Sequence, residues 1–104
     1  MKTETEPKVI IVFNVIFSCP LPFLDDVKQE ILDTAPGVPE GALLTTKQLC
    51  SEEFYSPLSK WEKSLAGACV DYLSKNGLVP FENVPRKGRN PYPLQYRVKR
   101  NWYQ

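Results

Sequence analysis

The sequence predicts a single α+β domain with three helices, a C-terminal β-hairpin and an extra N-terminal strand. Apolar residues recur at steps of three and four over residues 23–35 and 57–76, the pattern of amphipathic helices. Residues 94–99 alternate between apolar and polar, which is typical of a strand. At 104 residues, 42% of them hydrophobic, the chain is long enough for one compact domain, 1–104, with a packed core. We expect residues 1–8 to be frayed.

Residues 9–17 are almost wholly β-branched or aromatic. This composition favours a buried strand over a helix, so we predict one strand here, as an extension that could pair two copies through its β-edge. Pro20 and Pro22 follow. Proline lacks the N–H that a strand ladder or a helix interior needs, so the chain is expected to turn there.

The first helix is predicted over residues 23–35. Asp25 and Asp26 would lie in its first turn, where negative charge suits the positive end of the helix dipole. Pro36 and Gly37 would end it.

A short second helix is predicted after Thr45. This threonine can serve as the N-cap, and Gln48, three residues later, completes a capping box of the type Ser/Thr-x-x-Glu/Gln. Residues 51–56 loosen the pattern and are expected to form a turn. That turn is longer than the usual three or four residues between the helices of a helix-turn-helix.

The third helix, residues 57–76, has the clearest periodicity of the chain. We expect Ser56 as its N-cap, Pro57 at its first position and Gly77 just beyond its end. Its apolar stripe, which is expected to face the core, consists of Leu58, Trp61, Leu65, Ala68, Cys69, Tyr72 and Leu73.

A C-terminal hairpin is predicted from residues 78–84 and 94–99, joined by a turn over residues 85–93 that holds three prolines and one glycine. Its charge differs from that of the rest of the chain. Residues 1–85 carry seven basic and all twelve acidic side chains, a net of −5, whereas residues 86–104 carry six basic side chains and no acid. Such an asymmetry is expected of a protein that places one element against a polyanion.

The order helix, short strand, helix, turn, longer helix and hairpin resembles the winged helix-turn-helix family. The resemblance covers residues 23–100, and its most diagnostic segments are Leu44-Thr45-Thr46-Lys47-Gln48-Leu49 and Tyr72-Leu73-Ser74-Lys75-Asn76-Gly77-Leu78-Val79. The resemblance implies a winged helix with the C-terminal hairpin as its wing. It also implies that the third helix enters the major groove of DNA while the wing lies along the backbone or the minor groove.

The same resemblance implies the DNA-binding residues. On the third helix they are Ser59, Lys60, Lys63, Ser64 and Gly67, and in the wing Arg86, Lys87, Arg89 and Asn90, with Arg97 and Lys99 behind. The basic groups would release counterions from phosphates, and Lys60, Lys63 and the guanidinium groups could address guanine edges. Lys60 and Lys63, with Glu62 beside them, equally fit the solvated face of an amphipathic helix.

We therefore expect duplex DNA binding by a small transcriptional regulator or an accessory factor of a phage or plasmid. One alternative is a winged-helix module that binds another protein, because fold does not fix function. Another is binding of RNA or single strands through aromatic side chains interleaved with the basic ones.

Other classes of function find little support in the sequence. There is no histidine, no Gly-rich phosphate loop and no Gly-x-Ser-x-Gly, so we expect no enzyme and no cofactor. Cys19, Cys50 and Cys69 are widely spaced and are expected to be reduced, apolar thiols rather than metal ligands. Residues 9–17 are too short to span a bilayer, and the charges before them do not resemble a signal peptide, so a cytoplasmic location is expected. DNA binding would make that location nucleoid-associated.

Overall fold

The N-terminal apolar run forms a β-hairpin, which corrects the single strand expected over residues 9–17. The computed structural model describes residues 7–12, 14–84 and 94–99. Strands β1 (Lys8–Val12) and β2 (Val15–Cys19) pair antiparallel, with Val12 opposite Val15. Asn14 has a φ of 69°, a left-handed conformation that asparagine tolerates better than most residues. The turn contains neither glycine nor proline, which is why the sequence pattern missed it.

Helix α1 (Leu21–Thr34) begins two residues earlier than expected and takes Pro22 into its first turn. Proline is tolerated there because the first N–H groups of a helix have no intrahelical partner. The strand ends before Pro20, as expected, but the expectation that Pro22 lies outside a helix is wrong. Asp25 and Asp26 lie beyond the first turn. A 3₁₀ turn, η2 (Ala35–Gly37), follows the helix.

The second helix is capped as predicted, but it is followed by another helix instead of a turn. In α2 (Thr46–Leu49) the Thr45 N–H donates to the Gln48 side chain at 2.9 Å, closing the capping box. In α3 (Glu52–Tyr55) the Ser51 side chain accepts a hydrogen bond from the third N–H that follows it. Ser51 thus caps a single helical turn where an irregular one was expected.

Helix α4 (Lys60–Lys75) begins three residues later than expected. Its N-cap is Ser59, not Ser56. Ser59 accepts from the Glu62 N–H at 3.1 Å, and its own N–H donates to the Glu62 carboxylate at 2.9 Å. These two reciprocal bonds satisfy two backbone N–H groups of the helix start. Ser56, which precedes Pro57, has no Glu or Gln three residues later and could not form the second bond. At the other end Gly77 has a φ of 68°, as expected of a residue that ends a helix.

The C-terminal hairpin consists of β3 (Phe81–Val84) and β4 (Gln95–Val98), which pair antiparallel. Its first strand is shorter than the predicted residues 78–84. Leu44 adds a strand-like segment beside β4, because its N–H and C=O each bond the backbone of Tyr96 at 2.8 Å. The predicted alternation of β4 is confirmed, with Tyr96 buried. The turn predicted over residues 85–93 lies outside the described part of the chain.

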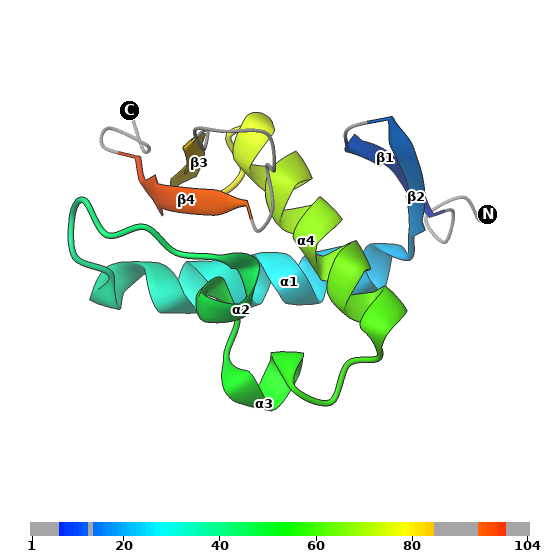
Figure 1. Ribbon diagram of the computed structural model, residues 1–104, viewed down its shortest axis with the longest axis horizontal. Coiled ribbons are helices and arrows are strands. Elements are labelled where there is room, and N and C mark those ends of the chain that lie inside the picture. The colour runs from blue at the N-terminus through cyan, green and yellow to red at the C-terminus, as the bar shows by residue number, and fades with distance from the viewer. Residues whose placement is uncertain (1–6, 13, 85–93, 100–104) are drawn as a thin grey trace.

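The described elements form an α+β arrangement, as predicted. Figure 1 shows α4 crossing α1, with β1 and β2 on one side of α4 and β3 and β4 on the other. Both helices and both hairpins contribute to one core, whose largest fully buried side chains are Tyr96, Phe81, Ile10, Ile31, Leu49, Leu73, Val27, Val70 and Val79. The N-terminal hairpin therefore packs into the same core as the helices.

Candidate nucleic-acid interface

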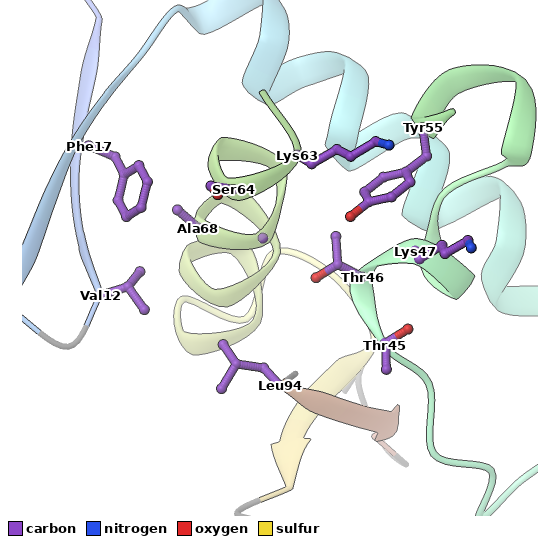
Figure 2. A pocket seen from close by; sticks show the side chains of 11 residues that line it. Val12, Phe17, Thr45, Thr46, Lys47, Tyr55, Lys63, Ser64, Ala68 and Leu94 are labelled. Carbon is purple, nitrogen blue, oxygen red and sulfur yellow. The ribbon is translucent and has the colours of Figure 1, made fainter. Parts of the chain in front are cut away.

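A groove of about 300 Å³ runs along α4 between the N-terminal hairpin and α2. Figure 2 shows Phe17 and Val12 of the hairpin on one side of the helix, and Thr46, Lys47 and Tyr55 on the other. The lining residues are Val12, Phe17, Thr45, Thr46, Lys47, Tyr55, Lys63, Ser64, Gly67, Ala68 and Leu94. Five separate segments of the chain therefore meet at this surface: the N-terminal hairpin, α2 with its N-cap, α3, α4 and the residue before β4.

Small side chains form the floor of the groove. Ser64 is exposed, Gly67 is partly buried and Ala68 is buried. A Cβ placed on Gly67 would lie 3.7 Å from the Thr46 hydroxyl, so this glycine lies at the α2–α4 contact. Because these side chains are short, another molecule can approach the helix closely along Ser64.

Three lysines lie around this surface, on two helices. Lys47 projects from α2 and is exposed, and Lys60 is exposed in the first turn of α4. Lys63, one turn further on, has its Nζ 5.4 Å from the centre of the Tyr55 ring. Neither of the salt bridges found among the described residues involves these lysines. Their charges are thus available to an anionic partner.

The structure places the predicted helix residues in different roles. Ser59 is occupied with capping α4, and Gly67 faces Thr46. Lys60, Lys63 and Ser64 are the predicted helix residues that are accessible and not engaged in capping or in the α2–α4 contact.

The predicted wing residues are only partly described. Arg86, Lys87, Arg89 and Asn90 lie outside the described residues. Arg97 lies opposite Glu82 and donates to its carboxylate at 2.7 Å, so part of its charge is neutralised. Lys99 is exposed just after β4, at the opposite end of that strand from the groove-lining Leu94.

Sequence reasoning placed Trp61 in the core, and this expectation is wrong. Its side chain is 57% exposed and stacks on Phe17, with ring centres 5.4 Å apart and an interplanar angle of 21°. Trp61 has the helical spacing of the apolar stripe, but it contacts the N-terminal hairpin and is not enclosed by the core. Helical periodicity predicts which residues share a side of a helix, and it does not predict how deeply each is buried. Lys47 was also missed, because its place beside the groove depends on how α2 lies against α4.

The cysteines are buried, as expected, and two of them are in contact. The sulfurs of Cys19 and Cys69 lie 3.2 Å apart, linking β2 to α4. Burial raises the pKa of the Cys19 and Cys69 thiols and raises the pKa of Cys50 to about 12. Such thiols stay protonated near neutral pH and are poor nucleophiles. Within the described ranges, no three potential metal-ligating side chains come together.

No known protein family, curated protein or solved structure matches this chain. Among the described residues, no helix has the length and apolarity needed to cross a membrane.

Proposed function

We propose that this chain is a winged-helix protein that binds duplex DNA through the start of α4 and the basic C-terminal hairpin. The observation that carries the proposal is the surface formed by Lys60, Lys63 and Ser64 on α4 with Lys47 of α2 beside it. It combines positive charge with small side chains on an exposed helix face. Phosphates and base edges in a major groove require that combination.

The order of the elements supports the winged-helix assignment. Helix α1 is followed by the strand-like Leu44, then α2 and α3, then α4 and the β3–β4 hairpin. The pairing of Leu44 with β4 extends that hairpin to three strand-like segments beside the helices. A winged helix has this order except for α3, which occupies the place of the turn, and its last hairpin is the wing.

The distribution of charge along the sequence supports an anionic partner. The segment that joins β3 to β4 and the residues after β4 carry Arg86, Lys87, Arg89 and Arg100 without any acid. A plot of log affinity against log salt concentration has a negative slope, and each lysine or arginine that neutralises a phosphate makes this slope steeper by about 0.9. Binding by this protein should therefore weaken steeply as salt rises.

The test compares single lysine variants on a fluorescently labelled duplex of random sequence, with anisotropy measured at several salt concentrations. Lys60→Gln and Lys63→Gln should each weaken binding and flatten the salt slope by about 0.9. Lys28→Gln removes the same charge from α1, at a residue outside the proposed interface, and is the matched control. Undetectable binding by the unmodified protein at low salt, or equal effects from all three variants, would refute the proposal.

A protein-binding module is the second candidate, and two separate exposed apolar features favour it: Trp61 on α4, and Ile11 and Ile16 on the N-terminal hairpin. It predicts that changing Arg86, Lys87 and Arg89 to Glu leaves biological activity intact. DNA binding predicts that the same change abolishes it.

A further inference from the structure

Two buried cysteines meet where the N-terminal hairpin packs on α4. Cys19 is the last residue of β2, and Cys69 lies in the middle of α4, 50 residues further along the chain. Both residues are 0% exposed, and their sulfurs are 3.2 Å apart. Cys50 is also buried, but among the described residues the contact between sulfurs joins Cys19 and Cys69 and does not include it. The fold therefore selects one pair from the three cysteines.

The contact is close to the geometry of a disulfide. A disulfide holds its two sulfurs at about 2.05 Å, so the Sγ atoms of Cys19 and Cys69 have to approach each other by about 1 Å. Small rotations about the two Cα–Cβ bonds produce a displacement of this size. Since β2 is held by its pairing with β1, and Cys69 by the helix, the two sulfurs meet repeatedly in the folded chain.

We propose that Cys19 and Cys69 form an oxidation site, at which a low-molecular-weight disulfide such as oxidised glutathione converts the two thiols into a disulfide that joins β2 to α4. One cysteine loses its proton, and its thiolate attacks a sulfur of the oxidant, which leaves a mixed disulfide and expels one glutathione thiolate. The thiolate of the other cysteine then attacks the protein sulfur of the mixed disulfide and expels the second glutathione thiolate. The two cysteine protons pass to the two expelled thiolates, so two protein thiols are oxidised and one glutathione disulfide is reduced.

Burial determines when this exchange takes place. In the folded chain the two thiols are shielded from solvent, and their raised pKa leaves little thiolate to react. The exchange therefore takes place while the chain folds, or when the N-terminal hairpin opens away from α4. Once formed, the bond is enclosed by the same core, and reductants reach it as slowly as oxidants reach the thiols.

The crosslink fixes one wall of the groove along α4. Phe17 lies two residues before Cys19 on the same face of β2, and Ala68 directly precedes Cys69. Both Phe17 and Ala68 line the groove. A disulfide beside them holds the hairpin against the helix, and because it closes a long loop it stabilises the folded chain. This consequence is independent of what the groove binds.

The three cysteines allow the effect of the fold to be separated from the effect of chain length. A disulfide would close a loop of 19 residues for Cys50–Cys69, 31 for Cys19–Cys50 and 50 for Cys19–Cys69. In an unfolded chain the probability of closure falls with about the 3/2 power of loop length, so Cys50–Cys69 should exceed Cys19–Cys69 about fourfold. The folded chain should reverse this order, because Cys19 and Cys69 are in contact.

The test equilibrates the reduced protein with reduced glutathione and an excess of oxidised glutathione, once during refolding and once in concentrated urea. Free thiols are then blocked with iodoacetamide, and mass spectrometry of proteolytic peptides identifies the linked pairs. The refolded protein should contain mainly the Cys19–Cys69 crosslink, with Cys50 alkylated and a mass lower by about 2 Da from the two hydrogens lost at the crosslink. The protein in urea should contain mainly Cys50–Cys69.

Two variants and a stability measurement complete the test. Cys50→Ala removes a buried cysteine outside the contact, so it is the matched control and should keep the Cys19–Cys69 crosslink. Cys19→Ala should remove the crosslink. The urea midpoint of the oxidised protein should be higher than that of the same protein reduced with dithiothreitol, both for the unmodified chain and for Cys50→Ala. Cys19→Ala should show no such rise.

The proposal is overturned if the refolded protein keeps all three thiols free or carries only glutathione adducts, if another pair is its main crosslink, or if the Cys19–Cys69 crosslink lowers the urea midpoint. A contact that is only an S–H···S hydrogen bond would give the first of these outcomes. Should a variant fail to fold, the peptide map of the unmodified protein decides by itself.

Discussion

Replacement of Trp61 by Ala measures how far this side chain belongs to the core. Somewhat less than half of its surface is buried, chiefly against Phe17. With about 200 Å² for a whole tryptophan side chain, the area lost at about 25 cal/mol per Å² amounts to about 2 kcal/mol of unfolding free energy. The better helix propensity of alanine returns up to about 0.5 kcal/mol. We therefore expect a net loss of about 1.5–2 kcal/mol.

Urea unfolding followed by far-ultraviolet circular dichroism gives this loss as a shift in midpoint at unchanged slope. A fully core tryptophan would lose about 3–5 kcal/mol, and a loss of that size would refute the half-exposed position of Trp61.

A double-mutant cycle with Phe17→Leu isolates the ring contact and should give a coupling of about 0.5–1.5 kcal/mol. Phe23→Leu, in a separate aromatic pair with Phe54, is the matched control and should show no coupling to Trp61. Equal coupling in the two cycles would contradict the stacking.

Three further predictions concern the backbone and the buried thiols. Gly67→Ala should raise unfolding free energy by about 0.5–1 kcal/mol, because its Cβ would lie in ordinary contact, 3.7 Å, with Thr46; a lower urea midpoint would show that α2 and α4 approach more closely. Asn14→Ala should cost about 1–2 kcal/mol because Asn14 is left-handed, whereas Asn14→Gly should not destabilise, and equal losses in the two would contradict this conformation. Stability should fall as pH rises above 9, because the thiol of Cys50 ionises near 9.0 when unfolded and near 12 when folded, so the unfolded chain releases its proton first. Cys50→Ala should reduce that fall by up to about 1.4 kcal/mol per pH unit, and an unchanged pH profile in urea unfolding would refute the burial of this thiol.

Part of the candidate site follows from local sequence. Lys60, Lys63 and Ser64 share one exposed side of a helix because they lie three and four residues apart, and that spacing is readable in any helix. The Gln48 capping box was equally predictable, since its hydrogen bonds join residues three apart. The contribution of Lys47 was not, because it depends on how α2 lies against α4.

The sequence by itself determined the α+β class, the existence and approximate place of the main helices, the alternation of β4 and the separation of charge along the chain. These depend on periodicity, capping and composition, which act over a few residues. Only the tertiary structure decided that residues 8–19 form a hairpin, that Trp61 is half exposed on Phe17, and that Cys19 meets Cys69. Those contacts join residues about fifty positions apart or depend on a turn without glycine or proline, so local patterns carry no record of them.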